Sequence, residues 1–253
     1  MSSLVIDDLS IRFGGIKALD GLTLSVEPGQ ICGLIGPNGA GKTTLFNCVS
    51  RVYQPTSGTI TWDGSDLLAV PAHGIARHGV SRTFQNLGLF PSMTFLENTM
   101  VGAHPYGRTG FVRSILSWGV RQEERRIRRE AYELLEFLDL GHLAFEPAAG
   151  QPFGTLKRLE LARALAARPR LLLLDEPAGG LTHAEVDELA ETIRHVRDEK
   201  GLSVLLVEHH MGMVMGISDT VVAMNFGKKI TEGTPAEVRR HPEVVSAYLG
   251  TRA

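Results

Sequence analysis

Cysteine, aromatic residues, excess charge and long apolar runs are all scarce in this sequence. Two of its 253 residues are cysteines, 6% are aromatic, and the formal net charge is −2. Two cysteines do not make a disulfide framework, so we expect a reducing compartment. No apolar run approaches the ~20 residues of a membrane-spanning helix, so work at a membrane would require docking on another subunit. The lack of a basic excess argues against a nucleic-acid partner.

The rest of the composition is ordinary for a soluble globular protein, with 21% charged and 43% hydrophobic residues. The length allows one large domain or a core with a subdomain. Residues 1–8 contain no basic region followed by an apolar one, so we expect no secretory signal. Cys32 and Cys48 flank a glycine-rich segment, and we interpret both as small core residues.

This glycine-rich segment lies between a predicted strand at 31–35 and a predicted helix at 44–49. Its pattern, Gly-x-x-x-x-Gly-Lys-Thr, is the phosphate-binding P-loop. Glycines let the backbone curl so that its N–H groups and the helix N-terminus surround a polyphosphate. The predicted nucleotide-binding residues are Gly36, Pro37, Asn38, Gly39, Ala40, Gly41, Lys42, Thr43 and Thr44.

Two side chains of the loop have predicted roles of their own. Lys42 is expected to reach the β- and γ-phosphates, and the Thr43 hydroxyl is expected to hold Mg2+. A chance match to the pattern occurs in about one chain of this length in a hundred, and the flanking strand and helix make it rarer. The sequence therefore predicts a nucleoside triphosphate ligand.

Three short apolar segments predict an α/β fold. Residues 31–35, 171–175 and 203–207 match parallel strands covered on both faces. Residues 4–35 are predicted to form strands joined by tight turns, and residues 22–26 and 58–63 alternate between apolar and polar positions, which predicts an antiparallel β layer around the start of this core. The other predicted elements of the core are strands at 220–224 and 228–231 and a terminal helix near 237–249.

Residues 86–166 differ in character and are expected to be helical. Apolar positions recur at helical spacing from Arg121 to Leu140, and the other face is rich in arginine and glutamate. This charged face is either a patch for anions or lipid headgroups or, as we favour, a solvated face with internal ion pairs. Residues 104–118 are predicted to be a loop or a broken helix.

Two consecutive carboxylates follow the apolar run 171–174. Asp175 is placed to reach Mg2+ beside Thr43, and Glu176 is placed to activate an attacking water, as phosphoryl transfer to water requires. The structural alternative is a cap at the end of the strand. Burial of a second carboxylate before a proline is costly without a cation or a partner, which favours the functional interpretation.

Three further residues are candidates for the same site. His209 follows the strand at 203–207 and is placed to contact the γ-phosphate, although a lone histidine there is more often structural. Gln85 precedes the helical segment and is placed to contact both Mg2+ and water. Phe13 precedes two glycines, which indicate a bend that presents its ring, whereas a lone Phe would usually belong to the core.

In order and spacing, the loop at 36–44, Gln85, the segment 171–177 and His209 resemble the ATP-binding subunits of ABC transporters. The resemblance covers essentially the whole chain. It implies a single ABC ATPase domain, a P-loop NTPase core with an N-terminal antiparallel β subdomain and an inserted α-helical subdomain. The implied division is residues 1–85 and 167–253 for the core with its β layer and 86–166 for the helical subdomain.

The resemblance also implies roles for single residues. Phe13 stacks on adenine, Gln85 senses the membrane subunit and Glu176 is the catalytic base, with ATP and Mg2+ as cofactors. Two such subunits form a head-to-tail dimer in which each ATP lies between one P-loop and the partner's signature motif. The family signature Leu-Ser-Gly-Gly-Gln aligns with residues 151–155, where Gly154 matches and the serine is replaced.

Within this family, residues 81–91, 207–211, 229–235 and 242–250 resemble the branched-chain amino-acid importers. This implies a peripheral ATPase on the cytoplasmic face of the inner membrane that energises uptake of branched-chain amino acids or related amides. Implied partners are membrane permease subunits, an identical or related second ATPase subunit and, indirectly, a solute-binding protein. The alternatives are a lipid or lipopolysaccharide exporter ATPase, a soluble ABC mechano-ATPase and a non-hydrolysing nucleotide-binding regulator.

Overall fold

The computed structural model describes residues 3–83, 87–103 and 117–249. The chain divides into two compact units, a core unit of residues 1–82 and 170–253 and an insert unit of residues 83–169. Within the described ranges, no helix combines the length and the apolar character that crossing a membrane requires.

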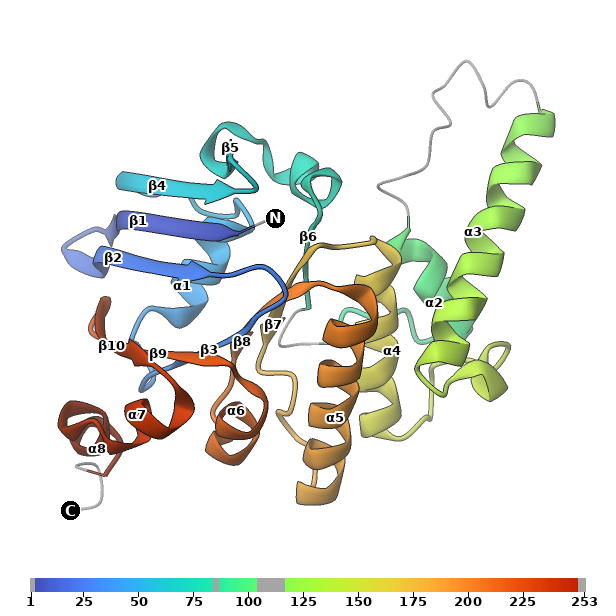
Figure 1. Ribbon diagram of the computed structural model, residues 1–253. Coiled ribbons are helices and arrows are strands. Elements are labelled where there is room, and N and C mark those ends of the chain that lie inside the picture. Colours follow the sequence, from blue (N-terminus) through green and yellow to red (C-terminus); the bar gives the residue numbers. More distant parts are fainter. Residues whose placement is uncertain (1–2, 84–86, 104–116, 250–253) are drawn as a thin grey trace. The chain divides into compact units, whose positions relative to one another are not determined.

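The core unit contains a six-stranded sheet of order β10-β9-β3-β8-β7-β6 (Figure 1). Neighbouring strands from β9 to β6 are parallel, and β10 runs antiparallel to β9. The predicted strands at 31–35, 171–175 and 203–207 are confirmed, and every residue in them is buried. The bounds are β3 Ile31–Ile35, β6 Val80–Arg82, β7 Leu171–Asp175, β8 Ser203–Val207, β9 Thr220–Asn225 and β10 Lys228–Gly233.

A second, antiparallel sheet of order β2-β1-β4-β5 confirms the predicted β layer. Its inward side chains, such as Leu4 and Ile6, form one apolar core with Phe46 and Trp62. Burial of each such side chain contributes roughly 1.5–3 kcal/mol. The indole N–H of Trp62 donates to the carbonyl of His78 at 3.0 Å, so this buried polar group is satisfied. The bounds are β1 Leu4–Phe13, β2 Ile16–Val26, β4 Ser57–Trp62 and β5 Ser65–Asp66.

Both cysteines lie in this core, as predicted. Cys32 is on β3 and Cys48 is on the helix that follows the glycine-rich loop, and both are buried and free. Burial raises the pKa of the Cys32 thiol to about 12 and that of Cys48 to about 11. Both thiols therefore stay protonated and behave as small apolar groups.

At the C-terminal end of the core unit, the prediction of a single helix near 237–249 is wrong. Two helices occur there, because His241 between them is extended at φ −66° and ψ 125°. A proline follows, and its ring disfavours the helical conformation of the residue before it. The helices are α1 Lys42–Val49, α5 His183–Lys200, α6 Met211–Ile217, α7 Pro235–Arg240 and α8 Pro242–Leu249, with 3-10 turns η1 Leu67–Ala69 and η2 Ala72–His78.

The described part of the insert unit is helical, as predicted. The helix expected at 121–140 begins earlier and ends earlier, at Ser117–Phe137, and Arg126 on it pairs with glutamates one turn away. Of the expected loop or broken helix at 104–118, residues 104–116 lie outside the described residues. The helices are α2 Phe95–Gly102, α3 Ser117–Phe137 and α4 Phe153–Ala166, with a 3-10 turn η4 Gly141–Leu143.

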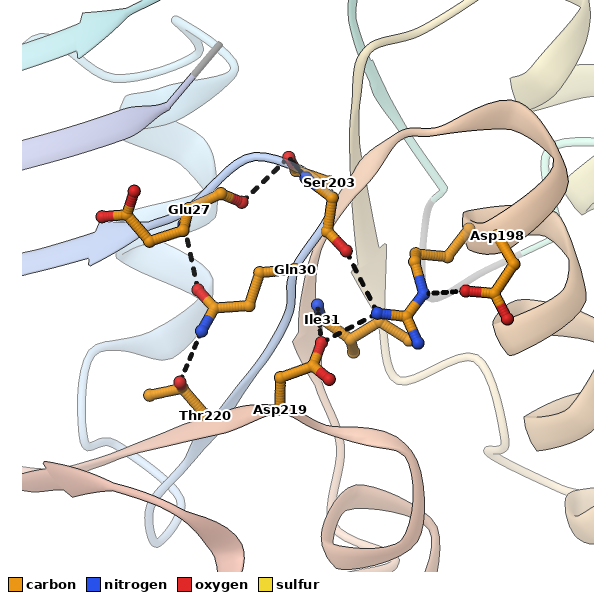
Figure 2. A network of polar contacts seen from close by, with 9 residues as sticks. Glu27, Gln30, Ile31, Asp198, Ser203, Asp219 and Thr220 are labelled. Carbon is orange, nitrogen blue, oxygen red and sulfur yellow. Dashed lines mark hydrogen bonds and ion pairs between the residues drawn. The ribbon is translucent and has the colours of Figure 1, made fainter. Parts of the chain in front are cut away.

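A polar network joins the amino-terminal ends of β3, β8 and β9 (Figure 2). The Asp219 carboxylate, just before β9, accepts the backbone N–H of Ile31 at 2.8 Å and a bond from Arg197 at 3.0 Å. At the start of β8, the hydroxyl of Ser203 donates to the carbonyl of Glu27 at 3.1 Å. This edge of the sheet is therefore occupied by internal bonds, and the opposite, carboxyl edge is where ligands bind open α/β sheets.

Asp219→Ala should destabilise the core unit by about 1–3 kcal/mol, because the buried N–H of Ile31 would lose its partner. Urea unfolding followed by circular dichroism measures this change. Asp198→Ala is the matched control, since Asp198 also pairs with Arg197 but is 62% exposed. An exposed pair contributes about 0–1 kcal/mol. Equal losses in the two variants would contradict the role given to the Ile31 bond.

Candidate nucleotide site

The glycine-rich loop connects β3 to α1 at the carboxyl edge of the central sheet. Its backbone passes other chain segments too closely for a side chain. A Cβ on Gly36 would lie 2.5 Å from the carbonyl oxygen of Met224, and one on Gly41 would lie 2.5 Å from that of Ala18. Gly41 also has φ +105° at the start of α1, which favours glycine. Both glycines of the P-loop pattern are therefore required by the fold.

Lys42 is buried and its ammonium is turned back onto the loop, donating to the carbonyls of Gly36 at 2.6 Å and Pro37 at 3.1 Å. Desolvation lowers the pKa of Lys42, and the nearby Glu176 and Asp175 carboxylates oppose that shift. The first turn of α1 holds no acidic residue, so no side chain of that turn neutralises the partial positive charge at the N-terminus of the helix. The loop thus offers backbone N–H groups and one cation to an anion.

Asp175 ends β7, and its carboxylate forms an ion pair with Arg82, the last residue of β6, at 2.6 Å. The two side chains are only 6% and 8% exposed. The same guanidinium donates to Asn47 at 2.7 Å and to Ser50 at 3.0 Å, and it lies over the ring of Phe46. Arg82 therefore connects the predicted metal ligand to α1.

Glu176 leaves the strand with a left-handed backbone, φ +50°, directly before a proline. Its N–H donates to the carbonyl of Val207 at 2.8 Å. Its carboxylate lies 2.8 Å from Nε2 of His209, which follows β8. The predicted base and the residue predicted to contact the γ-phosphate are thus within hydrogen-bond reach of each other.

The structure brings Lys42, Asp175, Glu176 and His209 together at the carboxyl ends of β3, β7 and β8, as predicted. The roles assigned to them stay predictions. Thr43 is exposed and Thr44 half-buried in the first turn of α1. Gln85 lies outside the described residues.

Phe13 belongs to the core unit and Gly154 to the insert unit. Phe13 ends β1 before Gly14, whose φ is +58°, and its ring is 45% exposed, as the predicted bend requires. The ring of Tyr53 packs edge-on against it, with centroids 5.1 Å apart. Gly154 is the second residue of α4 in the insert unit, and α4 begins after Pro152.

Two residues of this region, Arg82 and Glu208, were not identified from the sequence. Glu208 is a buried carboxylate directly after β8, just as Asp175 ends β7. The sequence pattern that could have identified Glu208 is an acidic residue directly after an apolar strand. Arg82 is the last residue of a three-residue strand, and so short a segment gives no sequence pattern that indicates its ion-pair partner.

Arg82→Met should reduce the free energy of unfolding by about 3–5 kcal/mol, because the buried Asp175 carboxylate would lose its counter-charge. The measurement is urea unfolding without nucleotide at pH 7. The double variant Arg82→Met, Asp175→Leu is the matched control and should be more stable than the single variant, since neither charge of this pair is left. A single variant as stable as the wild type would contradict this account of the ion pair.

Comparison with known proteins agrees with this geometry. Residues 19–179 match the family described as "ABC transporter", and residues 228–253 match "Branched-chain amino acid ATP-binding cassette transporter". The high-affinity branched-chain amino acid transport ATP-binding protein BraF of Pseudomonas aeruginosa is 45% identical, with 98% of this chain and 97% of the relative covered. LivG of Escherichia coli, with the same description, is 42% identical at the same coverage.

Solved structures are similar over the full length. The crystal structure of the ADP conformation of an ATP-binding cassette of an ABC transporter matches with a TM-score of 0.87 and 29% identity, covering 99% of both chains. A nucleotide-free cassette from an ABC transporter matches with a TM-score of 0.85 and 29% identity, covering 98% of this chain and 99% of that one.

Proposed function

The chain belongs to the ABC transporter family of ATP-binding proteins, and we propose that its ATP hydrolysis energises uptake of branched-chain amino acids or related amides. The observation that carries the hydrolytic part is the contact between Glu176 and His209 beside the buried lysine of the P-loop. The class of solute is supported by the printed descriptions of the relatives and by the family match at residues 228–253.

In this proposal the backbone N–H groups of residues 36–44 and the ammonium of Lys42 bind the triphosphate. Binding requires the ammonium to exchange its carbonyl partners, Gly36 and Pro37, for phosphate oxygens. Phe13 supplies an exposed ring on which adenine stacks. The desolvated lysine is a strong partner for phosphate, because few waters compete for it.

Mg2+ fits the residues present. The Asp175 carboxylate and the Thr43 hydroxyl offer the oxygen ligands this ion prefers, and Gln85 is a third proposed ligand. The ion, when bound, neutralises charge that develops on the phosphates. Arg82 holds one carboxylate oxygen of Asp175 at 2.6 Å, so the orientation of this ligand is set before any ion binds.

Glu176 is the proposed base that accepts a proton from the attacking water. His209 is the proposed partner that holds the carboxylate in place through Nε2, and its second proposed role is contact with the γ-phosphate. With Nε2 protonated, the imidazole donates to Glu176 and orients the carboxylate. The pair therefore couples orientation of the base to the presence of the phosphate.

The partners in the proposal are membrane permease subunits, a second ATPase subunit, identical or related, and indirectly a solute-binding protein. The chain would act at the cytoplasmic face of the inner membrane. The relatives are described as ATP-binding proteins of transport systems, which supports a separate permease. Gly154 and its neighbours at the start of α4 are the proposed surface toward the nucleotide of the second subunit.

Glu176→Gln should keep ATP binding and lose turnover by about 100-fold or more, because an amide of the same shape cannot accept the proton. Phosphate release and binding of a fluorescent ATP analogue give the two quantities. Lys42→Ala is the comparison variant and should lose the binding itself. Turnover at the wild-type rate in Glu176→Gln would refute the assignment of the base.

The solute class is tested by isolating the permease subunits that copurify with a tagged chain and placing the complex in vesicles. Leucine with its binding protein should stimulate ATP hydrolysis several-fold, and Glu176→Gln should abolish the stimulation, since transport and hydrolysis are coupled. Histidine serves as the control solute of another amino-acid class. Stimulation by histidine and none by leucine, isoleucine or valine would contradict the proposed solute.

A further inference from the structure

Glu208 is a buried carboxylate on the segment that carries His209, and it also binds the segment that carries Glu176. It is 3% exposed and directly precedes His209. Its Oε1 accepts the backbone N–H of Ala178 at 2.7 Å. Its Oε2 accepts the N–H groups of His209 at 2.7 Å and His210 at 3.0 Å. One carboxylate therefore binds backbone on both sides of the Glu176–His209 contact.

These bonds satisfy a charge that would otherwise be costly to bury. An ionised carboxylate in an apolar interior needs partners for its lone pairs, and bonds to an ionised acceptor are the strong ones. Three backbone donors on two segments serve this purpose here. The bonds fix main chain rather than flexible side chains, so they restrain the direction in which neighbouring side chains leave the backbone.

The segment that Glu208 restrains contains a strained residue. Glu176 has φ +50°, a region unfavourable for a residue other than glycine and more so before a proline. Such a conformation persists only where the surroundings impose it. The Glu176 N–H is held by Val207, and the Ala178 N–H two residues later is held by Glu208. The last residue of β8 and the residue that follows it thus hold the strained segment at both ends.

We propose that Glu208 is a positioning residue for ATP hydrolysis, which sets the Glu176 carboxylate and the His209 imidazole against each other by binding the backbone of both segments. The inference rests on the proposed function of Glu176 as base. Glu208 itself does not touch the nucleotide and transfers no proton. Its effect passes through the 2.8 Å contact between Glu176 and His209.

Glu208→Gln tests this with little change in shape. The amide keeps one acceptor oxygen and places an NH2 group against backbone N–H donors, so at least one bond on one side is lost. We expect kcat to fall between about 10- and 100-fold, as a small misplacement of catalytic groups does. The KM for ATP should stay within about twofold, because the P-loop contacts are untouched. Glu237→Gln is the matched control, because Glu237 likewise accepts a backbone N–H, from Thr234 at 2.8 Å, at the start of α7.

A double variant separates positioning from general loosening of the fold. If Glu208 acts through His209, then adding Glu208→Gln to the His209→Ala variant should lower kcat by a much smaller factor than Glu208→Gln lowers it in the wild type. The proposal would be overturned if the fold decrease in kcat of the double variant equalled the product of the two single decreases. A kcat like that of the wild type in Glu208→Gln would overturn it as well. If Glu208→Gln does not fold, Glu208→Asp carries the same comparison, with a shorter side chain that cannot reach both segments.

The outcomes also separate this inference from the proposed function. A wild-type protein without ATPase activity, or a fully active Glu176→Gln variant, would refute the proposed function. An active wild type and an inactive Glu176→Gln, together with an unaffected Glu208→Gln, would refute the role of Glu208 alone.

Discussion

The close approach of backbone to backbone around the P-loop is the constraint on which the nucleotide site depends. The N–H of Gly227 in the β9–β10 turn donates to the carbonyl of Ala40, and the N–H of Asp20 on β2 donates to Gly227. A Cβ on Gly41 would collide with the carbonyl of Ala18. The loop is thereby held between the antiparallel sheet and the last hairpin of the central sheet. Its phosphate-binding shape is a property of both sheets and not of the loop alone.

Three carboxylates at the carboxyl edge of the sheet are stabilised in three ways. Asp175 has a guanidinium, from Arg82. Glu176 has an imidazole, from His209, and Glu208 has backbone N–H groups. The difference fits the roles proposed for the three residues. The proposed metal ligand has a fixed counter-charge nearby, the proposed base has an imidazole partner, and the proposed positioning group is held by backbone atoms that do not titrate.

The sequence was sufficient to predict those parts of the fold that follow from a local sequence pattern. The apolar segments 31–35, 171–175 and 203–207 are strands, because parallel strands covered on both faces must be apolar. The P-loop pattern identified Lys42 as a site candidate, and in the structure Lys42 lies near the Glu176 and Asp175 carboxylates. The prediction of one terminal helix was wrong, because His241 before Pro242 is extended and separates two helices. Arg82 was missed since its partners, Asp175 and Asn47, are 93 and 35 residues away, and no local pattern reports such contacts.

The strained backbone at Glu176 explains why two adjacent carboxylates have different neighbours. In a regular strand, successive side chains point to opposite faces of the sheet. In the structure the strand ends at Asp175, and the left-handed conformation of Glu176 directs the chain into a new segment. The separation of the proposed metal ligand from the proposed base is therefore produced by strain at one residue. That strain persists because Val207, the last residue of β8, and Glu208, which follows it, bind the chain on either side of the strained residue.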